Sequence, residues 1–171
     1  MFFSTKAEYG VRLLVELGRH PREAPVSLTA IAEAEGLPLG YLEQIAPRLR
    51  RAGLVVSARG AHGGYRLARD PREVTMDEVV LALEGAVAPM ECFLEQDHTG
   101  KTAARVMCSH QADQGRACAT KLLWTRVQGD VLRALARTTL AELIAFSERT
   151  SPVPVAVLPA VSSTGTGPAV A

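Results

Sequence analysis

Three cysteines are the residues of this chain best suited to metal or redox chemistry, and all lie between residues 86 and 119: Cys92, Cys108 and Cys118. This stretch is polar and shows poor hydrophobic periodicity, which indicates a long loop. Loops of this length inside a small protein are usually functional or disordered. Because thiolates prefer soft metals and iron–sulfur clusters, the stretch is predicted to be a sensor loop that holds one of them.

Other roles for these cysteines stay open from the residues alone. Their spacing, C-x15-C-x9-C, lacks the C-x2-C pair of common zinc sites. Buried structural cysteines are one alternative. A cysteine-dependent enzyme is another, with Cys92 or Cys108 as nucleophile and His98 or His110 as base. No phosphate-binding loop or other catalytic motif accompanies these residues, so this is the weakest hypothesis.

A second candidate site is a group of basic side chains. Seven arginines and one acidic residue, Asp70, lie between residues 48 and 72, so this window has a net charge of +6 in a chain of net charge +1. Arginine gathered in this way is typical of a surface that contacts nucleic-acid phosphate. The alternative is a solvated basic face with ordinary salt bridges.

The basic window overlaps a predicted helix over residues 38–51. Apolar side chains recur there at three- and four-residue spacing and predict one buried face: Leu42, Ile45 and Leu49. Gly53 ends the helix, because glycine accepts the left-handed backbone of a helix end. Pro47 removes a backbone donor, so we expect a kink there and groove contacts mainly from residues 38–46.

A glycine-rich hairpin follows this helix. Residues 54–56 and 65–67 predict two strands, joined by a tip at residues 60–64. An earlier predicted helix, residues 28–35 with Ser27 as its N-cap, precedes helix 38–51 by a short turn. Two helices, a turn and a two-stranded ribbon are the layout of a winged helix-turn-helix, whose second helix enters the major groove of DNA.

The side chains predicted to contact DNA lie on the outer face of the second helix, at its basic end and at the hairpin tip. Glutamine pairs with adenine at two atoms, and glutamate accepts from cytosine while repelling phosphate. Arg59 would reach an adjacent minor groove, where narrow A/T-rich DNA attracts arginine. The paired glycines at the tip allow close backbone approach, or simply form a tight turn. The predicted set is Ser27, Leu39, Gly40, Tyr41, Glu43, Gln44, Arg48, Arg51, Arg59, Gly60, His62 and Gly63.

Further helices are predicted from capping boxes, in which a Ser or Thr is followed three residues later by Glu. The three pairs are Thr5 with Glu8, Thr75 with Glu78, and Thr139 with Glu142. An amphipathic helix over residues 120–136 carries the only tryptophan, Trp124. Little core remains for it to cover, so we expect it to pair with its twin in a two-fold homodimer. Packing on its own domain is the alternative.

These patterns predict a mainly α protein with a winged helix-turn-helix and a long C-terminal dimerisation helix. The predicted units are the DNA-binding domain (1–85), the sensor loop (86–119), the dimerisation helix with a short terminal helix (120–148), and a disordered tail (149–171). The tail is predicted because residues 151–171 carry four prolines and no charge.

Composition bounds the class of protein. The chain has 171 residues, of which 47% are hydrophobic, enough for a folded core. No apolar run reaches the ~18 residues of a membrane span, and the N-terminus lacks the pattern of a secretory signal. A cytoplasmic protein is therefore expected, and an odd number of cysteines in a reducing compartment argues against structural disulfides.

Four sequence blocks together identify a resemblance. They are STKAEYG from Ser4, YLEQ from Tyr41, LRRAGLV from Leu49 and RGAHGGY from Arg59. Over about residues 1–146 the chain resembles the family of winged-helix repressors that includes the iron–sulfur cluster regulator IscR, the nitric-oxide sensor NsrR and the cysteine regulator CymR. The resemblance implies a homodimer that binds a two-fold-related operator in double-stranded DNA.

The resemblance also implies a role for the cysteines. Family members with three cysteines in this loop hold an iron–sulfur cluster whose state changes DNA affinity. By that analogy Cys92, Cys108 and Cys118 would be ligands of a [2Fe–2S] or [4Fe–4S] cluster, and the regulated genes would include those of cluster assembly. Here the cysteines lie further apart than in the better-known members, and Lys121 occupies the position of a family histidine. Glu8 from the other subunit, His110 and Asp113 are candidates for the fourth ligand. A cluster-free regulator that senses thiol oxidation or a metal is the alternative.

Overall fold

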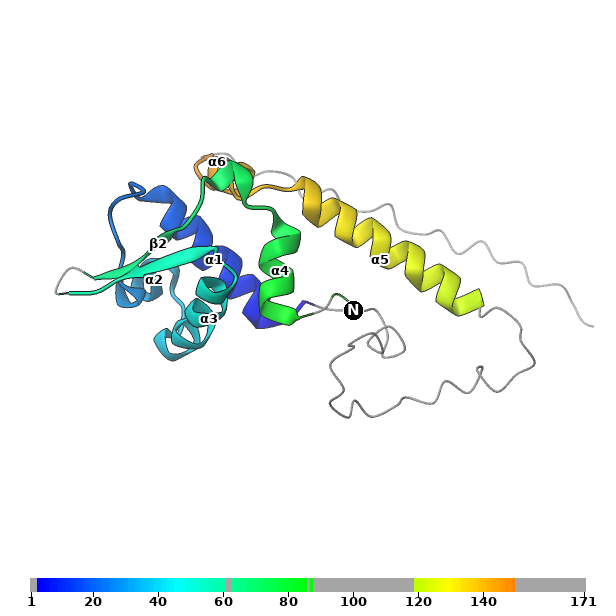
Figure 1. Cartoon of the computed structure of the whole chain (residues 1–171), viewed down its shortest axis with the longest axis horizontal. Coiled ribbons are helices and arrows are strands. Elements are labelled where there is room, and N and C mark those ends of the chain that lie inside the picture. The colour runs from blue at the N-terminus through cyan, green and yellow to red at the C-terminus, as the bar shows by residue number, and fades with distance from the viewer. Residues whose placement is uncertain (1–2, 61–62, 86, 88–118, 150–171) are drawn as a thin grey trace, which may run out of the picture.

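A computed structural model of the chain describes residues 3–60, 63–85, 87 and 119–149 (Figure 1). The elements are α1 (Thr5–Arg19), α2 (Leu28–Glu35), α3 (Leu39–Arg51), β1 (Val55–Ala58), β2 (Gly64–Leu67), the short 3-10 helix η1 (Pro71–Glu73), α4 (Met76–Glu84), α5 (Ala119–Arg137) and α6 (Leu140–Ser147). This order confirms the predicted mainly α fold with a winged helix-turn-helix. All but the first residue of the predicted disordered tail, and most of the predicted sensor loop, lie outside the described residues.

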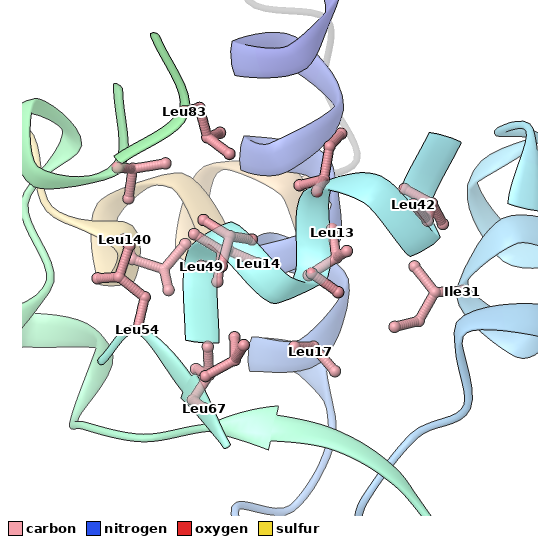
Figure 2. Close-up of a cluster of buried hydrophobic side chains, with 14 of the residues drawn as sticks. Leu13, Leu14, Leu17, Ile31, Leu42, Leu49, Leu54, Leu67, Leu83 and Leu140 are labelled. Carbon is pink, nitrogen blue, oxygen red and sulfur yellow. The ribbon is translucent and has the colours of Figure 1, made fainter. Parts of the chain in front are cut away.

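The hydrophobic core surrounds α1, which runs through the centre of the domain (Figure 1). Leu13 and Leu14 of this helix are fully buried. Figure 2 shows leucines from the other elements converging on them. The group includes Leu42 and Leu49 of α3, Leu54, Leu67 of β2, Leu83 of α4 and Leu140 of α6. Since burial of one leucine contributes about 1.5–3 kcal/mol, this cluster holds α3 and the hairpin on one rigid body.

The two strands form an antiparallel ribbon whose register runs from Val55 opposite Leu67 to Ala58 opposite Gly64. The loop before α2 joins this ribbon through Val26. Its backbone N–H donates to the Tyr65 carbonyl at 2.9 Å, and Tyr65 N–H donates to the Val26 carbonyl at 2.8 Å. The N-terminus of α2 is therefore held against the base of the β1–β2 hairpin, which is the wing of this fold.

The helix caps agree only in part with the predicted capping boxes. Ser4, not Thr5, caps α1, and its hydroxyl accepts from the Lys6 N–H at 3.2 Å, so the predicted Thr5–Glu8 box is wrong. Thr75 is at the N-cap of α4, but its hydroxyl donates to Asp77 instead of accepting from the helix, so its box with Glu78 is also wrong. The box of Thr139 and Glu142 is confirmed.

Helix α5 extends away from the rest of the domain (Figure 1), and none of its residues is buried. Leu122 and Leu123 near its N-terminal end are 57% and 55% exposed. After α5 the chain returns to the core, because Leu140 N–H donates to the Val74 carbonyl at 2.8 Å and the Leu140 side chain is fully buried. Among the described residues, no helix is long and apolar enough to cross a membrane.

Candidate nucleic-acid interface

The turn between α2 and α3 is built by residues 36–38. Gly36 adopts a left-handed conformation with φ +62°, which ends α2. Leu37 N–H then donates to the Ala32 carbonyl at 2.9 Å, and the Leu37 side chain is buried. Pro38 begins α3 without a side-chain cap. The short turn sets α3 at an angle to α2 and leaves one face of α3 on the surface.

The surface face of α3 carries three of the predicted residues. Gly40, Glu43 and Gln44 are exposed, at the three- and four-residue spacing that places them on one side of a helix. A Cβ at Gly40 would meet nothing within 4 Å, so this part of the face is open. The predicted residues Leu39 and Tyr41 are half-buried and pack against the core. They therefore support the face more than they form it.

The predicted arginines of α3 are exposed but point in different directions. Arg48 donates through Nη1 to the Leu83 carbonyl of α4 at 3.3 Å. Arg51 donates to the Pro47 carbonyl one turn earlier, also at 3.3 Å. Arg50, which was not in the predicted set, donates to the Ser57 hydroxyl of β1 at 3.4 Å. α3 continues through Pro47 to Arg51, so these side chains belong to the same helix as Gln44.

The basic window of the sequence is not one uniform surface. Arg69 forms an ion pair with Glu78 of α4, as the salt-bridge alternative expects. Arg66 of β2 is half-buried, whereas Arg59 and Arg72 are exposed. Phosphate contacts are therefore expected from a subset of the seven arginines.

The wing tip presents Arg59 beside Gly60, whose φ of +118° favours glycine. The predicted residue Gly63 donates its N–H to the Gly60 carbonyl at 2.9 Å. A Cβ at Gly63 would lie 2.5 Å from the Ala58 carbonyl oxygen, so the tightness of the turn explains this glycine without any ligand. His62 lies outside the described residues.

Ser27 is exposed at the N-terminus of α2, and its hydroxyl accepts from the Ala30 N–H at 3.1 Å. Free N–H groups at a helix N-terminus suit a phosphate oxygen. The bridge of Val26 to Tyr65 places this helix end beside the wing. The N-terminus of α2, the exposed face of α3 and the wing are thus held together, and we call these three parts the reading framework.

Two side chains of α1 contact the helices of the reading framework, and the sequence analysis did not predict these contacts. The rings of Tyr9 and Tyr41 meet edge to face with centroids 5.3 Å apart. One turn later, Arg12 contacts Glu35 at the end of α2. The signal in the sequence was the three-residue spacing that puts Tyr9 and Arg12 on one face of α1. Their partners on α2 and α3 could not be inferred from that spacing.

A cluster of charges extends from this contact along α1. Arg19 bonds both Glu35, at 3.3 Å, and Glu16, at 2.8 Å, and His20 Nε2 lies 3.1 Å from Glu16. Burial of Glu16, which is 9% exposed, disfavours its charge and would raise its pKa. Hydrogen bonds from Arg19 and His20 outweigh burial, so the pKa of Glu16 lies below its ordinary value of 4.5.

Two contacts flank the predicted sensor loop. Glu84, the last residue of α4, accepts from the Ser4 N–H at 3.1 Å and from the Ser4 hydroxyl. Gln128 of α5 donates to the Val87 carbonyl at 2.6 Å. The chain is therefore anchored to α1 and α5 at the point where this loop begins.

Glu8 is exposed on α1 and borders an apolar groove of about 650 Å³ formed by α1, α4, α5 and α6. Other lining residues include Phe3, Val11, Met76, Val80 and Leu135. The predicted ligands Cys92, Cys108, Cys118 and His110, and the alternative Asp113, lie outside the described residues. Within the described ranges no three potential metal ligands come together.

A helix-turn-helix with an open second helix and a basic wing defines a winged-helix DNA-binding protein. Residues 3–145 match the Rrf2 family, described as an iron-dependent transcriptional regulator. The chain belongs to this family, and the predicted resemblance to IscR- and CymR-type regulators is confirmed.

Individual relatives agree with this assignment. The chain is 35% identical to protein rrf2 of Nitratidesulfovibrio vulgaris, over 84% of this chain and 87% of that protein. It is 35% identical to the HTH-type transcriptional regulator CymR of Bacillus subtilis, over 86% and 93%. The solved structure of T. potens IscR matches with a TM-score of 0.66 and 35% identity, over 86% and 89%. The protein is a transcriptional regulator, and the enzyme alternative is set aside.

Proposed function

We propose that this Rrf2-family regulator binds a two-fold-related operator as a homodimer. The outer face of α3 would lie in the major groove and Arg59 at an adjacent minor groove. The observation that carries this proposal is that Gly40, Glu43 and Gln44 share an exposed face on the same rigid body as the wing. Half-sites would be about one helical turn apart.

The side chains on this surface have distinct chemistry toward DNA. Gln44 would pair with adenine, and Glu43 would accept from cytosine. Arg51 and the α2 N-terminus at Ser27 would contact phosphates, which set register and affinity but carry no base information. Arg48 would have to leave the Leu83 carbonyl to reach a phosphate.

Two features of the described residues support a homodimer. Leu122 and Leu123 expose apolar surface on a helix without a buried residue. The groove beside Glu8 is lined mainly by apolar side chains and lies at the other end of α5. A second copy, related by a two-fold axis, would cover both surfaces in each subunit.

The thiolates of Cys92, Cys108 and Cys118 would hold the iron–sulfur cluster, with Glu8 or His110 as the fourth ligand. Glu8 fits this role in two respects: it is exposed at the groove, and Ser4 rather than a box with Glu8 caps α1. A bound cluster would supply a centre sensitive to iron and to oxidation. The contacts of Glu84 and Gln128 would pass the state of the loop to α1 and α5.

A cluster-free regulator that senses thiol oxidation or a metal is the second candidate. It is favoured by the equal identity of this chain to CymR and to the IscR structure, 35% in each case. Regulation of cluster-assembly genes belongs to the first candidate only.

Two measurements test these proposals. The full-length protein, purified without oxygen, is used to enrich duplexes from a random-sequence DNA pool, and we call the product the enriched duplex. A two-fold-related site is expected, and failure to enrich any duplex would contradict operator binding. Iron and acid-labile sulfide are then measured in the wild type and in single Cys→Ser variants. A colourless, iron-free protein would favour the cluster-free candidate. Equal affinities for the enriched duplex with and without a cluster would refute control of DNA binding by the cluster.

A further inference from the structure

One arginine of α1 holds the last residue of α2 at two places. Arg12 Nε donates to Glu35 Oε2 at 2.9 Å. A second nitrogen of the same guanidinium, Nη2, donates to the main-chain carbonyl of Glu35. Glu35 directly precedes Gly36, where the chain turns toward α3. We call this pair of contacts the Arg12 clamp.

The clamp gives the main-chain carbonyl at the end of α2 a hydrogen-bond partner. The last carbonyls of a helix lack partners inside the helix and must bond elsewhere. A guanidinium suits this position because its donors form a rigid fork that reaches two acceptors at once. A Cβ at Gly36 would contact nothing within 4 Å, so no side chain packs against this position of the turn. The turn is held on its two sides, by the Arg12 clamp at Glu35 and by the buried Leu37, whose N–H donates to the Ala32 carbonyl.

The clamp lies next to the first turn of α3, whose side chains are less buried than those in the middle of the helix. Leu42, Ile45 and Leu49 are fixed by burial, but residues 39–41 at the start of α3 are half-buried or exposed. Pro38 gives this first turn no side-chain cap. The direction of this first turn, which carries Gly40, therefore depends partly on how the preceding residues 36–38 are held, in addition to the packing of Leu39 and Tyr41 on the core.

We propose that Arg12 is a positioning residue for operator recognition, which fixes the turn between α2 and α3 through Glu35 without contacting DNA. This inference rests on the proposed function. Loss of the clamp would leave the protein folded but would let the first turn of α3 move. Recognition of bases would then weaken, whereas attraction to phosphate would not change.

The chain offers a matched control for this test. Arg19 also donates to the Glu35 carboxylate, at 3.3 Å, but no contact joins it to the main-chain carbonyl of Glu35 within the described residues. Arg12→Gln and Arg19→Gln remove the same charge. Because Arg12 also lines the groove beside Glu8, the oligomeric state of each variant is measured first, and a variant that has lost the wild-type state would count against the positioning role. Each variant is titrated onto the enriched duplex and onto a scrambled duplex of the same length over a range of salt concentrations, and its thermal unfolding is recorded.

We expect Arg12→Gln to weaken binding to the enriched duplex about tenfold, which corresponds to about 1.4 kcal/mol. Its affinity for the scrambled duplex and its salt dependence should match the wild type. Arg19→Gln should stay within about twofold of the wild type on both duplexes. If Arg12→Gln does not fold, Arg12→Lys takes its place, since a single ammonium cannot reproduce the fork.

Two results would overturn the positioning role. An equal loss on both duplexes, with a smaller salt slope, would make Arg12 a phosphate ligand. Equal effects of Arg12→Gln and Arg19→Gln would mean that only surface charge matters. Failure of the wild type to enrich any duplex would overturn the proposed function and this inference together, whereas the first two results leave the proposed function intact.

Discussion

Single residues on the surface proposed to face DNA differ in what they would recognise. Gln44 is exposed beside Glu43 on the face of α3 that is proposed to lie in the major groove, where its amide would pair with a base. Arg51 also lies exposed on α3, near the end of the helix. Bases carry sequence information and phosphates do not. Changes at these two positions should therefore have different signatures.

Gln44→Ala should weaken binding to the enriched duplex by about 1–3 kcal/mol and relax selection at one base pair of each half-site. Arg51→Gln should weaken binding to every duplex and reduce the salt slope by about 1 per subunit. Fluorescence anisotropy on the enriched and scrambled duplexes measures both. Arg126→Gln, the same charge change at an exposed position of α5, is the control, and equal effects of all three variants would contradict the assignment.

The lowered pKa of Glu16 should make the free energy of unfolding depend on pH. Its pKa is below 4.5 in the folded protein, so its ionised form stabilises the fold above the unfolded pKa. That stabilisation is lost as pH falls through the lowered folded pKa. Urea unfolding should therefore show Glu16→Gln less stable than wild type at neutral pH, with the difference shrinking below pH 4.5. A difference between Glu16→Gln and wild type that stays constant with pH would contradict this role of Glu16.

At the scale of elements, the spacing of apolar residues predicted where the helices lie. The hydrogen bonds that cap those helices were predicted correctly only for α6. The three-residue spacing of Leu42 and Ile45 is enough to define the buried face of α3, because it reflects helix geometry alone. A capping box depends on which hydroxyl faces the helix. Ser4 and Thr5 are both suitable N-caps by residue type, and tertiary contacts with Glu84 favour Ser4.

The cap of α1 can be tested by comparing neighbours. Ser4→Ala removes the side-chain cap and a bond to Glu84, so it should lower the free energy of unfolding by about 0.5–2 kcal/mol. Thr5→Ala should be neutral or slightly stabilising, because Thr5 is exposed in the first turn and alanine favours helix. Urea denaturation at neutral pH measures both. The reverse order would restore Thr5 as the cap.

The whole molecule depends on contacts that the order of residues does not reveal. Arg12 and Glu35 are 23 positions apart, and Val26 and Tyr65 are 39 apart, so no local pattern pairs them. The exposed face of α3, in contrast, followed from its periodicity at Gly40, Glu43 and Gln44, although Leu39 and Tyr41 of the predicted face are half-buried. The roles proposed for Cys92 and its partners rest on family resemblance alone. What the fold adds is a single rigid body with one long amphipathic helix, α5, on which no side chain is buried.

The exposed leucines of α5 are predicted to form the dimer contact. Leu122 and Leu123 are more than half exposed, and each two-fold pair would bury four such leucines. Burial contributes about 1.5–3 kcal/mol per side chain, so the double variant Leu122→Ser, Leu123→Ser should raise the dimer dissociation constant by at least about a hundredfold. Analytical ultracentrifugation measures this constant, and Arg126→Ala on the same helix is the control. The monomer should retain its core, because no residue of α5 is buried, so its thermal unfolding should still be cooperative. An unchanged dimer, or a monomeric wild type, would show that α5 does not form the two-fold contact.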